Sequence, residues 1–172
     1  DVFTHDARMR IASRAGERGE TTYAYDALDM LRAISGPGLE WSAGYDALRR
    51  RVWKTVNGRT TRYRWDGDRL IAELRDDGGI RIYVYVDTAA LTPFMFLEYD
   101  AIDSPAKRGR AYYVHVDHRA TPVMVTQQGG AIAWRARIAP YGQAQIDAGA
   151  SIEMPLRFPG HYHDAETGLH YY

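Results

Sequence analysis

The sequence predicts an all-β fold in which tandem antiparallel β-hairpins form a twisted strip. Three observations support this prediction. A motif with an aromatic residue or histidine shortly before an aspartate recurs every 20 residues, glycine-rich turns recur with the same period, and aromatic residues alternate along the segments between the turns. The composition agrees, because 13 Tyr, 4 Trp and 16 Gly in 172 residues are typical of strands and turns rather than of helices.

The aspartates of the repeated motif are Asp6, Asp26, Asp46, Asp66 and Asp87. The first four are spaced by 20 residues, and the fifth comes one residue late. The carboxylate of such an aspartate can accept hydrogen bonds from backbone N–H groups two or three residues further on, which closes a tight turn. We therefore predict that all five are structural turn residues.

The segments around these aspartates read as strands. Tyr23 and Tyr25 have the same parity and are expected on one face of a strand, as are Tyr63 and Trp65. Asn57-Gly58 is among the strongest short signals for a hairpin turn. We expect successive antiparallel hairpins, in units that begin near Tyr23, Gly44, Tyr63 and Tyr83, with helix nearly absent.

Charge and cysteine content exclude several classes of protein. The 22 Lys and Arg residues balance 22 Asp and Glu residues, which argues against nucleic acid or an anionic membrane as the main partner. The absence of cysteine removes disulfides, thiol nucleophiles and cysteine-ligated metals. The longest apolar stretch, 91–97, is too short to span a membrane, and no segment resembles a signal peptide.

A cluster of histidines and acids near the end of the sequence is the best candidate for hidden chemistry. It comprises His161, His163, Asp164, Glu166 and His170. On a strand, the first and second of these histidines would share one face, a spacing that two ligands of one metal ion could use. An aromatic-rich structural strand explains the same residues more simply. We therefore predict no metal site, no cofactor and no catalytic residue.

A second set, His115, Asp117 and His118, fits a site less well. Strand alternation directs His118 away from the face that His115 and Asp117 share. The periodic carboxylates also fit structure better than catalysis, because equivalent positions in a tandem repeat have similar surroundings, whereas catalytic acids need distinct ones.

The repeated aromatic-x-Tyr-Asp units resemble the YD repeats of the Rhs family of bacterial polymorphic toxins, which are related to insecticidal toxin-complex C components and to teneurins. The segments 112–122, 127–142 and 158–171 resemble the conserved end of the Rhs core. Leu28-Asp29, Leu48-Arg49 and Gly67-Asp68 stand where the family has Gly-Arg. The residues that carry the core-end resemblance are His115, Asp117, His118, Pro122, Trp134, Pro140, Tyr141, Gly142, Gly160, Asp164, Gly168 and Leu169.

The resemblance implies a division into YD-type repeats over 1–87, a longer loop or insertion over 88–110 and a core-end segment over 111–172. It implies a strip wound into a hollow shell that encloses a C-terminal toxin domain until delivery by a secretion system. The partners would be other segments of that shell, the enclosed toxin domain and components of the secretion apparatus, with no nucleic acid among them. The Asp-Pro-x-Gly-Leu signature of self-cleavage is expected beyond Tyr172, because the sequence reads as part of a longer polypeptide.

Two other functions remain open at this point. Rows of tyrosine and tryptophan could stack on sugars in a carbohydrate-binding or adhesion module. A small enzyme that uses the His161 cluster is the third possibility. The exposure of Tyr63 and Trp65 would separate the first of these from a shell, because only exposed rings can bind sugars.

Overall fold

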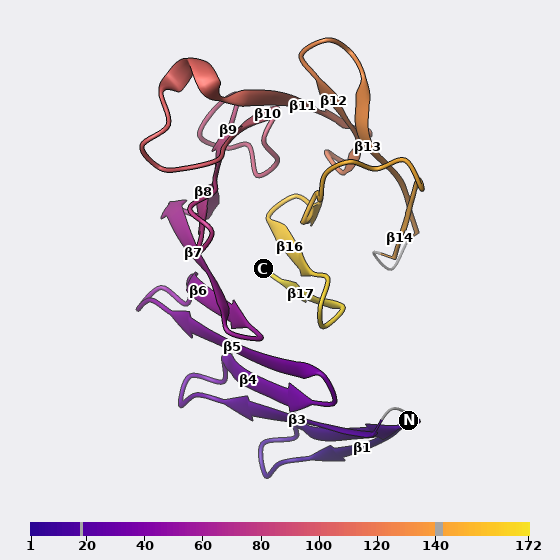
Figure 1. Ribbon diagram of the computed structural model, residues 1–172. Helices are drawn as coiled ribbons and strands as arrows, with labels where there is room; N and C mark the ends of the chain where they lie inside the picture. Colours follow the sequence, from indigo (N-terminus) through magenta and orange to yellow (C-terminus); the bar gives the residue numbers. More distant parts are fainter. Residues whose placement is uncertain (18, 140–142) are drawn as a thin grey trace. The chain divides into compact units, whose positions relative to one another are not determined.

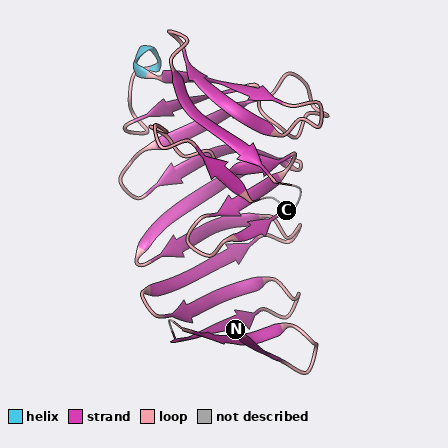
Figure 2. Ribbon diagram, turned by 90° about the vertical axis from the view of Figure 1, so that its right-hand side faces the viewer, coloured by secondary structure: helices cyan, strands magenta, loops and turns pink. Residues whose placement is uncertain are grey.

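The computed structural model describes residues 1–17, 19–139 and 143–172, and its regular structure is antiparallel β-sheet (Figures 1 and 2). Helix in the described residues is limited to one 3-10 turn, η1 (Ala106–Arg108), drawn in cyan in Figure 2. This confirms the predicted all-β class. The chain divides into two compact units, Asp1–Tyr63 and Arg64–Tyr172.

The first unit is a run of hairpins. Each strand pairs antiparallel with the next in sequence, as the 20-residue repeat predicts. Its small core is centred on Ile34, Trp41 and Ala43. The strands are β1 (Val2–His5), β2 (Ile11–Gly16), β3 (Gly19–Tyr25), β4 (Leu31–Gly36), β5 (Leu39–Tyr45), β6 (Arg51–Val56) and β7 (Arg59–Asp66), and the boundary between the units falls within β7.

Aspartate side chains close three turns of the first unit in the same way. Asp26 Oδ1 accepts hydrogen bonds from the backbone N–H of Leu28 at 2.8 Å and of Met30 at 2.9 Å. Asp6 and Asp46 accept the two corresponding bonds. In each turn, one aspartate carboxylate therefore satisfies two backbone N–H groups that are not hydrogen-bonded to the neighbouring strand.

Each of these turns holds one residue in the left-handed region of backbone space. The third residue after each aspartate has a positive φ: 64° at Met9, 64° at Asp29 and 63° at Arg49. This conformation brings the side chain close to the backbone in every residue except glycine, so it carries a cost here. A glycine at this position would remove that cost.

The second unit contains a run of paired strands and a separate small sheet. The run comprises β8 (Arg69–Arg75), β9 (Ile80–Val84), β10 (Met95–Tyr99), β11 (Arg110–Val116), β12 (Pro122–Gln127), β13 (Ile132–Ile138) and β14 (Ala144–Ile146). The small sheet comprises β15 (Leu156–Phe158), β16 (His161–Asp164) and β17 (Leu169–Tyr171). In Figure 1 the run from β8 to β14 is curved, and the small sheet, in yellow, lies on its inner side.

The structure differs from the sequence prediction over 88–110. The longer loop expected there contains β10, which pairs with both β9 and β11. Phe96, on β10, is completely buried, and its ring stacks on that of Tyr112 with centroids 5.0 Å apart. Pro93 and the polar residues after β10 lengthen the connections and hide the 20-residue period without ending the sheet. The compact units also divide after Tyr63, not at 87.

Candidate functional site

A buried ion pair joins two neighbouring strands of the second unit. Arg81 on β9 donates to Glu98 Oε1 on β10 from Nε at 2.9 Å and from Nη2 at 2.6 Å. Both residues are buried, and the two side chains are opposite each other in the register of the strands. Two bonds from one guanidinium that converge on a single carboxylate oxygen fix the geometry of the pair and offset part of the cost of burying two charges.

A neighbouring set of hydrogen bonds attaches the small sheet to the large one. Glu73, on β8, accepts a bond from the Tyr83 hydroxyl at Oε1 and a bond of 3.1 Å from the Tyr162 hydroxyl at Oε2. Tyr162 lies on β16, 89 residues further along the chain than Glu73. Burial raises the pKa of Tyr83 well above its ordinary value, and the charge of Glu73 adds to this shift, so Tyr83 remains a donor.

Ring contacts extend the same interface. The Arg157 guanidinium, on β15, lies 5.4 Å from the ring centroid of Trp134 on β13. Tyr171, on β17, meets Trp65 edge-on at 6.0 Å between centroids. These contacts show that β15, β16 and β17 all pack on the inner side of the second unit through arginine or aromatic side chains.

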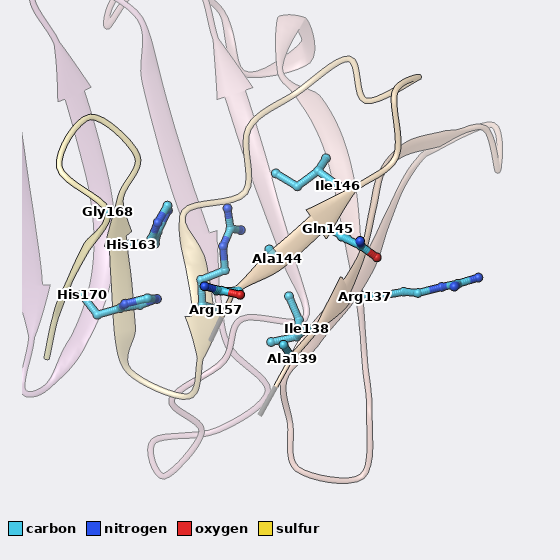
Figure 3. A pocket seen from close by; sticks show the side chains of 11 residues that line it. Arg137, Ile138, Ala139, Ala144, Gln145, Ile146, Arg157, His163, Gly168 and His170 are labelled. Carbon is cyan, nitrogen blue, oxygen red and sulfur yellow. The ribbon is translucent and has the colours of Figure 1, made fainter. Parts of the chain in front are cut away.

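A cavity of about 950 Å³ lies beside the small sheet, between β14 on one side and β15 to β17 on the other (Figure 3). Arg157, His163 and His170 line it together with apolar residues that include Ile138 and Ile146. Figure 3 shows the first three side chains grouped on one side of the cavity, whereas Arg137 points away from them. The polar wall of this cavity is therefore basic.

The two histidines of this wall form a cross-strand pair. His163 and His170 are opposite each other in the register of β16 and β17, and their ring centroids are 4.9 Å apart. Burial lowers the pKa of His163, as do the positive charges of Arg157 and His170, while Asp164 and Glu166 act in the opposite direction. Burial also lowers the pKa of His170. Both imidazoles therefore favour the neutral form more than a histidine in water does.

The structure separates the other members of the predicted histidine and acid cluster. His161 stacks on Tyr172 at 5.0 Å between ring centroids. Asp164 is buried, and strand alternation places it on the same face of β16 as Tyr162, away from His163. No three acidic or histidine side chains in the part of the chain that the structure describes are arranged to hold a metal ion.

The residues of the second predicted set lie at the surface. His115 is exposed on β11, and its Nε2 lies 3.0 Å from Thr126 Oγ1. His118 is exposed in the turn that follows. Asp117 accepts bonds from the backbone N–H of Arg119 and Thr121, and these bonds lower its pKa. This is the turn geometry of Asp26, with Ala120 at a φ of 59°.

The remaining core-end residues have structural surroundings. Pro122 and Trp134 are fully buried on β12 and β13. Gly160 and Gly168 each have a φ of 73° in the turns before and after β16, and Leu169 begins β17 opposite Asp164. Pro140, Tyr141 and Gly142 lie outside the described residues.

The last two predicted turn residues differ from the first three. The Asp66 carboxylate pairs with the Arg69 guanidinium across a turn that contains Gly67 at a φ of 56°. Asp87 Oδ1 accepts bonds from the backbone N–H of Ala89 and Ala90 in the connection between β9 and β10. Both aspartates lie at turns, but neither shows the two bonds of the Asp26 geometry among its recorded contacts.

Sequence reasoning missed the charged residues that organise this unit. Glu73, Arg81, Glu98 and Arg157 are all buried, although charged side chains in strands are ordinarily directed to water. One signal was present: Arg81 and Tyr83 have the same parity on β9, so an inward aromatic implies an inward arginine. Their partners could not be read from the pattern.

Comparison with known proteins identifies the family. The model of the teneurin YD-shell matches residues 2–171. The chain belongs to the YD-shell family. One relative, the double-stranded DNA deaminase toxin A of Burkholderia cenocepacia, is 30% identical over an alignment of 196 positions that covers 98% of this chain and 14% of the relative. Another, the toxin protein Tse5 of Pseudomonas aeruginosa, is 29% identical over an alignment of 211 positions that covers 98% of this chain and 15% of Tse5.

Two solved structures share the fold. A crystal structure of TcdB2-TccC3-TEV superposes with a TM-score of 0.67 at 18% identity and covers 88% of this chain and 8% of that one. The Tc holotoxin pore of Photorhabdus luminescens gives a TM-score of 0.65 over the same shares. The chain thus spans about one seventh of the length of the two curated relatives described above. In the described residues, no helix is long and apolar enough to cross a membrane.

Proposed function

We propose that this chain is a wall segment of a hollow shell that encloses a toxin domain of the same polypeptide until delivery. The observation that carries the proposal is the YD-shell match over residues 2–171. It is supported by two bacterial relatives named as toxins, each of which is similar to 98% of this chain. The partners of the segment are the neighbouring parts of the shell and the enclosed domain. Components of a secretion apparatus would contact the whole polypeptide. The aspartate turns and the core-end residues have a structural role in the wall.

The packing of the aromatic side chains favours a structural wall and argues against a sugar-binding module. Tyr63 is 1% exposed and lies under the Arg51 guanidinium at 5.0 Å. Trp65 is half-buried against Tyr171, and Trp41 and Tyr83 are buried. Rings in these positions stabilise the sheet and are not available for stacking on a sugar. Within this proposal the segment has a structural role and takes part in no catalytic step.

The proposal is tested in the full-length polypeptide by protease protection of the toxin domain. Glu98→Ala removes the partner of buried Arg81 and should open the wall, so that protease reaches the toxin domain faster than in the unaltered protein. Glu20→Ala, at an exposed position on β3, is the matched control and should leave protection unchanged. Equal digestion of the toxin domain in all three proteins and in the isolated domain would contradict enclosure.

A further inference from the structure

Arg157 is a buried cation without a recorded acidic partner. The residue is 5% exposed, its Nη1 donates to the Met154 carbonyl, and its Nε has no hydrogen-bond partner. No ion pair joins it to a carboxylate in the described part of the chain. Burial lowers its pKa, and the charge of Glu153 offsets only part of that shift. A buried guanidinium in this state is costly, and an anion beside it would lower the cost.

The two histidines next to Arg157 also have unsatisfied nitrogens. His163 Nδ1 and His170 Nε2 are buried without partners. Three neighbouring side chains on one wall of a cavity therefore each have a nitrogen with no recorded partner, and all three can carry positive charge. Such a group of side chains is suited to an anion that enters from the cavity.

We propose that this cavity is a docking site for an acidic segment of polypeptide, with a carboxylate side chain of that segment bound beside Arg157 and the histidine pair. A carboxylate matches the planar guanidinium, which can donate two parallel hydrogen bonds to it. The bound carboxylate would supply the negative charge that Arg157 lacks and would accept from a histidine N–H.

The size and lining of the cavity favour polypeptide over a small anion. About 950 Å³ is far more than one carboxylate fills, and Ile138, Ala144 and Ile146 give the cavity an apolar side that can pack against neighbouring residues of a segment. The strand β14 is the last in the strand order of its sheet. Among the described residues, no further strand pairs with its outer edge, so a polypeptide segment could add to the sheet there. The choice of polypeptide as the source of the carboxylate rests on the proposed function, in which other parts of the polypeptide face this wall.

Docking of a carboxylate should depend on pH. The charged and titratable groups that act on the histidine pair are Arg157 on β15 and His161 on β16, which disfavour the imidazolium, and Asp164 and Glu166, which favour it. Arg137 lines the same cavity and points away. A bound carboxylate would favour protonated His163 and His170, so binding should strengthen as the pH falls from about 7 toward 5, near the ordinary histidine pKa of about 6.5.

The test is a titration of the 172-residue chain, followed by NMR of the histidine ring carbons. The probe is a capped peptide of alternating glutamate and threonine, and the control peptide has glutamine in place of each glutamate. We expect the His163 and His170 signals to shift with the glutamate peptide, and the glutamine peptide to bind at least about tenfold more weakly. Equal binding of both peptides, or no shift with either, would overturn the proposal. Shifts with inorganic phosphate but not with the glutamate peptide would overturn the docking proposal in favour of a small-anion site. The enclosure of a toxin domain is not tested by this titration.

Two arginine variants locate the effect on the cavity wall. Arg157→Gln should weaken binding of the glutamate peptide about tenfold or more, whereas Arg137→Gln, an equal loss of charge at the same cavity, should leave it within about twofold. If Arg157→Gln does not fold, His170→Gln decides, because binding should then lose most of its increase at low pH. An equal effect of both arginine variants, or an unchanged pH dependence in His170→Gln, would contradict the proposal.

Discussion

The two units of the chain are stabilised in different ways. The first unit relies on contacts between neighbours in sequence, namely the antiparallel ladders and the aspartate turns, and its outermost strand, β1, is exposed along its whole length. The second unit also relies on side chains that meet across long stretches of sequence, such as Glu73 and Tyr162. A repeated pattern can therefore build the sheet, but holding the small sheet against it requires residues that occur once.

The largest effect is expected at the buried ion pair of the second unit. Glu98→Ala leaves the guanidinium of Arg81 buried and without its partner, which should lower the free energy of unfolding by about 3–5 kcal/mol. Denaturant unfolding measures this loss. Glu20→Ala, at an exposed position in the first unit, should change the free energy by less than about 0.5 kcal/mol, and equal losses would erase the distinction between the units.

The next effect concerns the bond between the two sheets of the second unit. Tyr162→Phe removes the hydroxyl that donates to Glu73 and should cost about 1.5–3 kcal/mol, because the acceptor is a buried carboxylate. A double-mutant cycle with Glu73→Gln isolates the shared part of this energy. Strictly additive losses would show that the two side chains do not couple and that the small sheet is held by other contacts.

The aspartate turns of the repeats should contribute less, one turn at a time. Asp26→Ala removes two local bonds to backbone N–H groups and should cost about 1 kcal/mol. Asp66→Ala should cost a similar amount through its turn and its contact with Arg69. Thermal unfolding is the measurement. A change in a biochemical activity with no change in stability would show that these carboxylates are functional and not structural.

A gain in stability is expected at the left-handed position of the same turns. Met9→Gly should raise the free energy of unfolding by up to about 1 kcal/mol, because glycine adopts a positive φ without steric cost. The Met9 side chain is 79% exposed, so little packing is lost. Met9→Ala is the control and should give no such gain. A loss of stability in the glycine variant would mean that the turn is not strained.

The smallest expected effect is the response of the histidine pair to pH. The folded-state pKa values of His163 and His170 are lowered by burial, so the unfolded chain binds more protons than the folded chain below its own pKa of about 6.5. Stability from this source is complete above that pH and declines as the pH falls through it toward the folded pKa values. His163→Gln with His170→Gln should flatten the decline between about pH 7 and pH 5 in urea titrations. An unchanged slope would show that other groups cause it.

The sequence predicted the structure of the first unit better than that of the second. The hairpins around Asp6, Asp26 and Asp46 could be predicted because every determinant of each turn lies within five residues. The residue with the positive φ could not be located from the family pattern. That pattern aligns its glycine with Leu28, whereas the structure has the positive φ at the next residue, Asp29.

Non-local partners could not be predicted in the second unit. Nothing near Arg157 in sequence indicates that it packs over Trp134, because the two residues meet only when the small sheet lies on β13. The strand β10 was missed for a related reason: its pairing with β11 spans the insertion that breaks the repeat. A single sequence carries the local signals of strands and turns, whereas these contacts depend on the whole unit.

In the proposed shell, the side of the second unit that carries the small sheet faces an enclosed polypeptide. A photo-reactive residue placed at Gln145, which lines the cavity, or at Tyr113, which is exposed on β11 where the adjacent Tyr112 is buried, tests this claim in the full-length protein. Mass spectrometry then identifies the cross-linked segments. We expect links from Gln145 to the toxin domain or to other segments of the same polypeptide, and none from Tyr113 to the toxin domain. Links to the toxin domain from Tyr113 and not from Gln145 would show that the opposite side of the sheet faces the enclosed domain.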